Sequence, residues 1–526
     1  MRQVKIYDTT LRDGTQAEEF NLSLGDKIRI AQRLDKLGIH YVEGGWPGAN
    51  PKDKEFFSEI RNYDLRVSRI AAFGSTHHKD KTPEADDNLQ KLLASRAPVV
   101  TIFGKSWTFH VNEILKTTLE RNLELITNSL GFLRPHVAEL IYDAEHFFDG
   151  FQADKEYALE TLSAAVAGGA HWLVLCDTNG GTLTTTLMEA IKAVKKRFPK
   201  APLGIHAHND SELAVANSIA AVGLGCDQVQ GTINGFGERC GNANLCSIIP
   251  NLEIKLKVHC IGEENLRRLS TVAHYVYEVA NLRPNRYQPY VGQSAFAHKG
   301  GVHAAAVLRN TQAYEHIDPE VVGNVRHIPV SELSGRSNLI FKARDFGLEL
   351  SPKDPVVAET LDRIKKLEFH GFQFEGAEAS LELMLRAALG QRKEYFRLQG
   401  FRVIDQKVGE DEPPVPEVTI RVHVGGEEVH TAAMGNGPVN ALDRALRKAL
   451  VRFYPRLSEM RLEDYKVRVL PGTGSTDAKV RVLIESRDAH DSWGTVGVSH
   501  DIIEASWQAL VDSINYKLFK DEQRGR

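Results

Sequence analysis

Cysteine is scarce in this sequence, which has only five among its 526 residues. The five are odd in number and include no C-x-x-C pair, so they do not form the framework of a disulfide-rich protein. Residues 1–15 carry several charges and lack the apolar core of a secretory signal. We therefore expect reduced thiols and a cytoplasmic location.

Long hydrophobic runs and a strong charge of either sign are also missing. No uncharged apolar stretch approaches the roughly 18 residues that a membrane-spanning helix needs. The formal net charge is −4, so there is no electrostatic basis for binding nucleic acid or an anionic membrane. The composition, 42% hydrophobic and 25% charged, is that of a globular protein, and the length predicts two to four domains.

The first 260 residues alternate short apolar runs with amphipathic stretches. Eight strands, each followed by a helix, predict a (β/α)8 TIM barrel. A doubly wound open sheet is the alternative, and it is disfavoured because no G-x-G-x-x-G follows the first apolar run. The predicted strands are 4–7, 41–44, 67–73, 99–103, 137–142, 172–176, 203–205 and 228–233, and the predicted helices include 24–37, 112–134, 157–166 and 183–197.

Two histidines close the seventh predicted strand. Side chains at i and i+2 of a strand point to one face, so His206 and His208 would present two imidazoles to one point. Arg12 and Asp13 follow the first strand, and the carboxyl ends of barrel strands carry the chemistry of such enzymes. Two imidazoles and a carboxylate suit a first-row divalent cation, and a guanidinium can stabilise charge that develops on a carbonyl oxygen. Taken alone, each motif also fits an ordinary strand end or a surface Arg–Asp pair.

Further candidates follow other predicted strands. Asn242 ends the glycine-rich loop 235–242 and could complete the coordination of a divalent ion, although an Asn there also fits a helix cap. Glu145 could be a general base or a carboxylate at a helix N-terminus. Thr178 could bind a substrate carboxylate or cap the next helix. His303, in the loop 293–303, could be an acid or base, although a loop histidine is more often solvated.

The remainder of the chain predicts two further regions. Helical patterns such as 264–282 and 354–367 dominate residues 261–392, which we interpret as a helical linker. Residues 393–526 predict an α+β domain with strands at 395–404 and 418–424. A strand-strand-helix pattern at 418–451 recurs at 479–518, so this domain contains a duplicated β-β-α unit.

Three motifs carry a resemblance to a known family. Asp-Thr-Thr-Leu-Arg-Asp-Gly-Thr-Gln (8–16), His-Ala-His-Asn-Asp (206–210) and Gly-Phe-Gly-Glu-Arg-Cys-Gly-Asn (235–242) resemble the DRE-TIM metallolyase superfamily. Within it they are similar to the acyl-CoA-condensing branch of isopropylmalate, homocitrate and citramalate synthases. Residues 393–526 resemble the leucine-type regulatory domain of that branch. The segments 43–48, 294–303 and 372–380 resemble its citramalate-forming members.

The resemblance implies a set of roles. A divalent metal (Mg, Mn or Zn) would be bound, and Arg12 would polarise the keto group of the substrate. Glu145 would lie beside the reacting centre. His303 and Tyr314 would reach the site from the linker, from a second subunit. The implied metal ligands are Asp13, His206, His208 and Asn242, and Gln16 and Thr178 would lie near the keto-acid carboxylate. One departure is the turn at 176–181. This chain has Cys-Asp-Thr-Asn-Gly-Gly there, whereas many relatives carry a Thr-Val or Thr-Leu turn.

The implied reaction is a Claisen-type condensation of acetyl-CoA with pyruvate, catalysed by a homodimer. Isopropylmalate or homocitrate formation from a bulkier keto acid, an acyl-CoA lyase and a non-catalytic amino-acid sensor are the alternatives. The regulatory domain predicts feedback inhibition, with isoleucine as the expected effector and the loop 471–477 as a guess for its site; a dimerisation module without an effector is the alternative.

Overall fold

A computed structural model describes residues 2–470 and 478–525, so the loop 471–477 lies outside the described residues. The chain forms two compact units. The first comprises Met1–Phe296 and Ile317–Arg326, and the second comprises Ala297–His316 and His327–Arg526. Each unit is described by itself.

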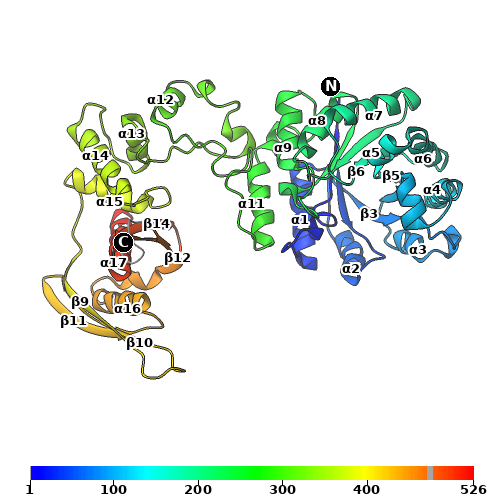
Figure 1. Ribbon diagram of the computed structural model, residues 1–526. Coiled ribbons are helices and arrows are strands. Elements are labelled where there is room, and N and C mark those ends of the chain that lie inside the picture. The colour runs from blue at the N-terminus through cyan, green and yellow to red at the C-terminus, as the bar shows by residue number, and fades with distance from the viewer. Residues whose placement is uncertain (1, 471–477, 526) are drawn as a thin grey trace. The chain divides into compact units, whose positions relative to one another are not determined.

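The first unit is built on a closed barrel of eight parallel strands in sequence order, which confirms the predicted TIM barrel (Figure 1). The strands are β1 (Lys5–Asp8), β2 (Tyr41–Gly45), β3 (Arg69–Ser75), β4 (Val99–Lys105), β5 (Glu139–Glu145), β6 (Trp172–Asp177), β7 (Leu203–Ala207) and β8 (Gln228–Gly231). The helices between and after them are α1 (Leu24–Leu37), α2 (Pro51–Glu59), α3 (Asp87–Ala94), α4 (Leu119–Leu133), α5 (Phe147–Ala153), α6 (Lys155–Ala167), α7 (Thr184–Arg197), α8 (Ala214–Gly223) and α9 (Leu245–Pro250).

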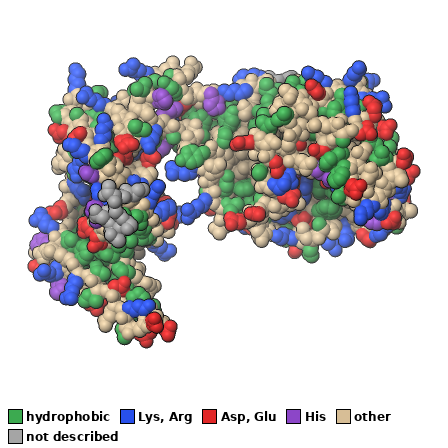
Figure 2. Space-filling model, viewed as in Figure 1, with side chains coloured by type: hydrophobic (Ala, Val, Ile, Leu, Met, Phe, Trp, Pro, Cys, Tyr) green, Lys and Arg blue, Asp and Glu red, His purple; other side chains and the backbone are tan. Residues whose placement is uncertain are grey.

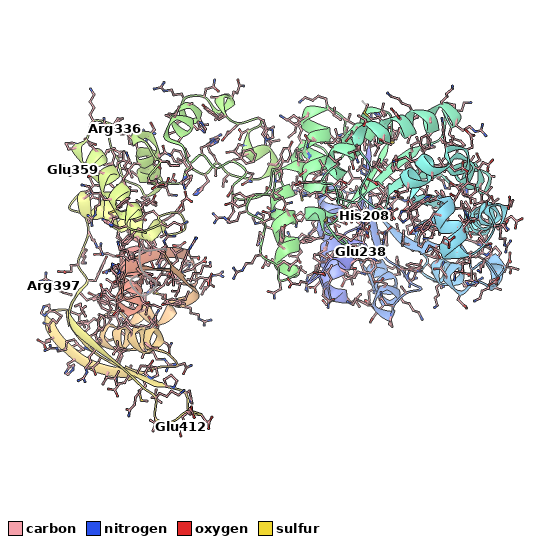
Figure 3. All side chains as sticks on the ribbon, in the orientation of Figure 1. His208, Glu238, Arg336, Glu359, Arg397 and Glu412 are labelled. Atoms are coloured by element: carbon pink, nitrogen blue, oxygen red, sulfur yellow. The ribbon has the colours of Figure 1, made fainter. Side chains whose placement is uncertain are left out.

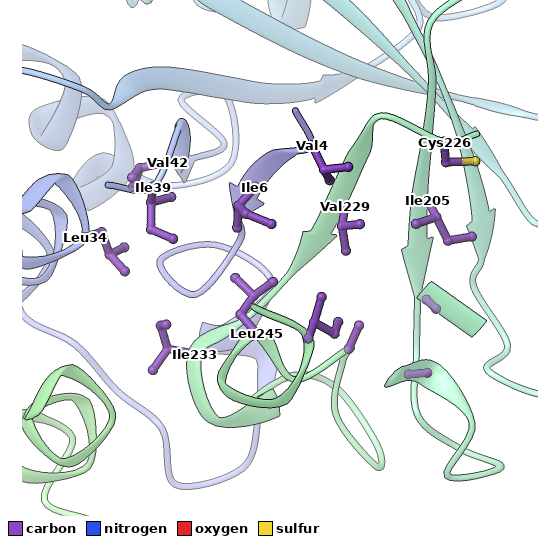
Figure 4. Close-up of a cluster of buried hydrophobic side chains, with 14 of the residues drawn as sticks. Val4, Ile6, Leu34, Ile39, Val42, Ile205, Cys226, Val229, Ile233 and Leu245 are labelled. Carbon is purple, nitrogen blue, oxygen red and sulfur yellow. The ribbon is translucent and has the colours of Figure 1, made fainter. Parts of the chain in front are cut away.

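Helix α1 shows how local sequence signals set these elements. Ser23 and Asp26 form a capping box at its start, and Gly38 ends it with a left-handed φ of 89°. The buried face of the helix includes Leu34, which lies in the same apolar cluster as Val42 of β2 and Ile6 of β1 (Figure 4). This cluster fixes the strands against their helices, so the loops at the carboxyl ends of the strands start from a rigid frame.

Several boundaries differ from the sequence-based prediction, by three residues at the end of β5 for instance, and two of the differences reflect local structure that the sequence pattern did not indicate. The expected helix 112–134 is interrupted: a π-helical segment covers His110–Leu115, and Lys116 adopts a positive φ of 53°. The side chain of Thr118 then caps α4. The expected strand 228–233 ends at Gly231 because Ile233 begins a 3-10 turn.

The interior of the barrel has an apolar and a polar layer. Tyr41, Val99 and Ile141 belong to the apolar cluster inside the barrel. Two positions further along the same strands lie Glu43, Thr101 and Asp143, all buried. Because side chains at i and i+2 share a face, the polar layer lies directly beyond the apolar one, toward the carboxyl ends of the strands. Barrel interiors are dominated by branched apolar residues, so a polar layer at this end indicates a functional site.

Helices dominate residues 261–392, as predicted. The expected helix 264–282 is two helices, α10 (Glu263–Leu266) and α11 (Leu269–Val279). The expected helix 354–367 is α14 (Pro355–Phe369). The other helices of this region are α12 (Gly301–Arg309), α13 (Arg336–Asp345) and α15 (Glu378–Ala388).

The tail contains the predicted duplication, but each repeat is longer than β-β-α. The repeats form two three-stranded antiparallel sheets, in the orders β11-β10-β9 and β12-β13-β14, and each is followed by a helix. The first comprises β9 (Phe396–Gln406), β10 (Val415–Val424), β11 (Glu427–Met434) and α16 (Pro438–Leu450), and the second comprises β12 (Arg461–Val469), β13 (Val480–Arg487), β14 (Ser492–Ser499) and α17 (Ile502–Gln523). Strand β12 was not predicted: only its second half alternates, with Tyr465, Val467 and Val469, and most of its residues are exposed, so no buried apolar face marks it.

Among the described residues, no helix is long and apolar enough to cross a membrane. Basic and acidic side chains are interspersed over the visible face of each unit (Figure 2).

Candidate metal centre and active site

Asp13, His206 and His208 converge inside the mouth of the barrel, as the sequence predicted. Their potential ligand atoms all lie within 4.8 Å of one another, and all three side chains are buried. His206 Nε2 lies 3.3 Å from Asp13 Oδ2 and 3.4 Å from His208 Nε2. Figure 3 labels two residues of the first unit near this group: the buried His208, and the exposed Glu238 of the glycine-rich loop.

Asn242 joins this group through the backbone of its loop. An isolated β-bridge pairs His208 with Asn242, and Asn242 Nδ2 donates to Asp13 Oδ2 at 2.7 Å. A Cβ at Gly237 would lie 2.0 Å from Asn242 Oδ1, so only glycine allows this close approach. The alternative role of Asn242 as a helix cap does not apply, because Asn244 caps α9.

The donor set fits a divalent ion. It offers a carboxylate, two imidazoles and an amide oxygen, a combination of N and O ligands that suits first-row divalent cations. Asn242 Oδ1 is buried and has no hydrogen-bond partner among the described residues, which is costly unless something else binds it. A cation bound by these side chains would satisfy that oxygen.

The electrostatics of the group favour cation binding. Burial alone would raise the pKa of Asp13, but the charge of Arg12 and the hydrogen bond and charge of His206 outweigh it and lower this pKa well below its usual range. Burial and the neighbouring His206 lower the pKa of His208 to about 4. Near neutral pH the pair therefore offers an ionised carboxylate and an uncharged imidazole, the forms that bind metal.

Arg12 is held in place from two sides. Its Nε donates to Glu43 Oε1 at 2.6 Å, and its Nη1 lies 3.4 Å from Asp13 Oδ1. The guanidinium also lies over the ring of Phe73, 3.7 Å from the ring centroid. Glu43 in turn accepts a hydrogen bond from Tyr7 at 2.8 Å. The sequence places Glu43 at the end of the second predicted strand, on the face expected to carry the chemistry, but it does not indicate the contact with Arg12.

Thr178 and Glu145 lie on neighbouring strand ends. Thr178 Oγ1 accepts a hydrogen bond from the backbone N–H of His146 at 2.8 Å, and it does not cap α7, which begins at Thr184. Glu145 ends β5 and forms an ion pair with Lys105 that the sequence did not predict. Gln16 ends a 3-10 turn after β1, and its side chain is exposed.

His303 and Tyr314 belong to the second unit and are not among the side chains that the barrel itself brings to the metal centre. The structure does bring them together: their rings stack with centroids 4.3 Å apart. Their role in the site stays a prediction.

Arg239 was not predicted to be a site residue. Its Nε and Nη2 donate to Asp210 at 2.8 and 3.0 Å, and Nη2 donates to the backbone oxygen of Thr178 at 2.7 Å. Arg239 therefore joins the loop that carries Asn242 to the loops that follow β6 and β7. The motif 235–242 contained this residue, but only the structure shows what it contacts.

Comparisons with known proteins cover the whole length of the chain. Residues 3–276 match the HMGL-like family, residues 290–371 match the homocitrate synthase post-HMGL domain-like family, and residues 375–518 match the LeuA allosteric (dimerisation) domain. The chain is 58% identical to a (R)-citramalate synthase of Geobacter sulfurreducens and 57% identical to one of Aquifex aeolicus, each covering 99% of both chains. It is 30% identical to a 2-isopropylmalate synthase of Methanocaldococcus jannaschii, covering 99% of this chain and 96% of that protein.

Proposed function

This chain belongs to the family of (R)-citramalate synthases, within the wider HMGL-like family, and from that premise we propose that it condenses acetyl-CoA with pyruvate to (R)-citramalate and CoA. A C–H bond of the acetyl methyl group breaks, and a C–C bond forms to the keto carbon of pyruvate. Water then hydrolyses the thioester, and CoA leaves as the free thiol. The observation that carries the proposal is the convergence of Asp13 and two histidines beside Arg12 in a chain that matches these synthases from end to end.

The barrel side chains have separable tasks in this reaction. Asp13, His206, His208 and Asn242 would hold a divalent ion, with Mg²⁺, Mn²⁺ and Zn²⁺ as candidates. Such an ion supplies Lewis acidity toward a carbonyl oxygen when it is bound. Nη2 of Arg12 has no hydrogen-bond partner in the described part of the chain, so it can donate to the substrate oxygen on which negative charge develops.

The keto-acid carboxylate is assigned to Thr178, with Gln16 nearby. Because Thr178 Oγ1 already accepts a hydrogen bond from His146, its own hydrogen remains for donation to a carboxylate oxygen. The substrate carboxylate needs a hydrogen-bond donor at this position, because an ionised carboxylate only accepts hydrogen bonds.

We assign proton removal from the acetyl methyl group to His303, assisted by Glu145 and with Tyr314 beside the histidine. His303 and Tyr314, which belong to the second unit, would come from the other subunit of a homodimer. The match of residues 375–518 to a LeuA allosteric (dimerisation) domain supports the oligomer and an allosteric role for the tail. Isoleucine, the end product expected for a citramalate route, is the feedback inhibitor that we propose.

A panel of keto acids tests the proposal. Initial rates of CoA release would be measured with a free-thiol reagent for pyruvate, 2-oxoisovalerate and 2-oxoglutarate, each with and without a chelator. We expect pyruvate to react fastest and the chelator to abolish the rate until a divalent ion is added back.

The other synthases and the amino-acid sensor each have their own outcome in this panel. A preference for 2-oxoisovalerate or 2-oxoglutarate would identify an isopropylmalate or homocitrate synthase instead. Absence of CoA release with every keto acid, together with absence of bound metal, would favour a non-catalytic amino-acid sensor.

A further inference from the structure

The polar layer inside the barrel contains two side chains that the proposed mechanism does not use, Gln230 and Asp143, and a chain of contacts joins them to His206. Gln230 Nε2 of β8 donates to Asp143 Oδ1 of β5 at 3.1 Å. Gln230 Oε1 lies 2.9 Å from Nδ1 of His206 on β7. All three side chains are buried, with exposed fractions of 0 to 6%.

The orientation of the Gln230 amide is fixed by its neighbours. Nε2 faces two acceptors, because Gln228 Oε1 also lies 3.3 Å away. An amide nitrogen carries hydrogens and an amide oxygen carries none, so Oε1 must be the atom that faces His206. His206 Nδ1 therefore carries a hydrogen and donates it to Gln230.

This hydrogen bond decides which nitrogen of His206 is available to a cation. In a neutral imidazole with hydrogen on Nδ1, the lone pair is on Nε2. Nε2 is the atom that lies 3.3 Å from Asp13 Oδ2 and 3.4 Å from His208 Nε2. The ring of His206 thus presents its lone pair to the group that would hold the ion.

His208 lacks a comparable partner. Its Nδ1 is buried and makes no hydrogen bond to any residue in 2–470 or 478–525. The two imidazoles of the site therefore differ, because the protein fixes the tautomer of one and leaves that of the other unfixed.

We propose that Gln230, oriented by Asp143, is a positioning residue that presets the His206 tautomer for binding of the divalent ion. The inference rests on the proposed cation site and deepens it. Residues that hold a metal-binding histidine through its other nitrogen typically contribute about 10- to 100-fold to metal affinity.

The first test compares two glutamines on one strand. Binding of Mn²⁺ to the metal-free full chain would be measured by titration calorimetry for the wild type, Gln230→Met and Gln228→Met. We expect the Mn²⁺ dissociation constant to rise about 10-fold or more for Gln230→Met. Gln228 is equally buried, and Gln228→Met removes only the longer contact to Gln230 Nε2, at 3.3 Å. Asp143 still orients the amide, so the Mn²⁺ dissociation constant of Gln228→Met should stay within about twofold of the wild type.

The second test reverses the hydrogen bonds without changing shape. Asp143→Asn lets the Gln230 amide turn round and offer Nε2 to His206, which favours the wrong tautomer, so Mn²⁺ should bind more weakly. Adding Gln230→Glu restores an acceptor for His206 Nδ1 that the new amide at position 143 can support, and affinity should return. Titrations at pH 8.5 keep the native Asp143 ionised, since burial raises its pKa to about 7.

The outcomes distinguish failure of the positioning role of Gln230 from failure of the cation site itself. Unchanged Mn²⁺ affinity in Gln230→Met, or a double variant no tighter than Asp143→Asn alone, would overturn the positioning role while leaving the cation site intact. A wild-type chain that binds neither Mn²⁺ nor Zn²⁺ would remove the cation site and this inference together.

Discussion

Arg12 Nε donates to Glu43 Oε1 at 2.6 Å, and this buried contact joins the loop after β1 to the end of β2. The contact holds the guanidinium beside the metal centre, with Nη1 3.4 Å from Asp13 Oδ1. Glu43 is itself fixed by the hydroxyl of Tyr7. Arg12 is therefore preorganised, and preorganised charge is what stabilises a developing oxyanion.

Arg12→Lys should lower turnover at least tenfold, which corresponds to about 1.4 kcal/mol of barrier. A lysine ammonium is a single point of charge and cannot contact Glu43, Asp13 and a substrate oxygen in one plane. Initial rates of CoA release with pyruvate would measure the effect. Arg29→Lys, on the surface of α1, serves as the control, and turnover of Arg12→Lys equal to that of the control would remove Arg12 from the chemistry.

Arg239→Lys should raise the KM for pyruvate about fivefold with a smaller effect on kcat. The side chain is 39% exposed, so we expect the loss of its forked contact to Asp210 and Thr178 to cost only about 1 kcal/mol. Steady-state kinetics would show it. Arg121→Lys is a matched control, because Arg121 also bonds one carboxylate and one backbone carbonyl elsewhere on the barrel. Equal KM values for the two variants would contradict a role for Arg239 in holding the loops.

Lys517→Met should destabilise the second unit by about 3–5 kcal/mol. Lys517 is buried on α17 and donates to Asp488 and Asp521 at 2.7 and 2.8 Å. Its loss removes this partner from two buried carboxylates and leaves Asp488 with the longer contact to Arg524, at 3.7 Å. Calorimetric unfolding of the full chain would report the shift. Lys393→Met, which removes an exposed lysine paired with Glu522, should change the transition little. A similar transition temperature for both variants would argue against the buried pair as a source of stability.

The same pair predicts a pH dependence. Burial alone would raise the pKa of Asp488, but hydrogen bonds from Lys517 and from the backbone of Asp491 and His490 outweigh it and lower this pKa. A lowered folded pKa contributes stability that is complete above the unfolded value, about 4, and is lost as the pH falls below it. Denaturant unfolding between about pH 3 and 7 should show this loss for the wild type and less of it for Asp488→Asn. Parallel pH profiles would count against the assignment.

Isoleucine at millimolar concentration should lower CoA release if the tail has the regulatory role that we propose. Leucine at the same concentration tests the specificity of the effector. Activity that neither amino acid changes would support the alternative, a dimerisation module without an effector.

The sequence predicted the barrel because strand and helix signals agreed along the first unit, as in α1, where the capping box of Ser23 and Asp26 and the terminal Gly38 mark both ends. It predicted His206 and His208 because side chains at i and i+2 of a strand share a face, and Asp13 because it follows the first strand, at the end of the barrel that carries the chemistry. The interruption at Lys116 could not be predicted, since a left-handed lysine leaves no mark in hydrophobic periodicity.

The contacts of Glu43 and Gln230 in the site were not predicted, for a different reason. Both lie inside buried strands, where a polar residue has meaning only through partners that are distant in the chain. The division at residues 260 and 392, and the roles of His303 and Tyr314, stay predictions.

The polar layer within the barrel lowers the stability of the fold. Tyr7, Glu43, Thr101 and Asp143 occupy volume that valine or leucine would fill with less desolvation. Rebuilding this layer with aliphatic side chains should give a protein that survives heating better and has no activity. The stability that this layer costs is thus the counterpart of the chemistry that its polar side chains make possible.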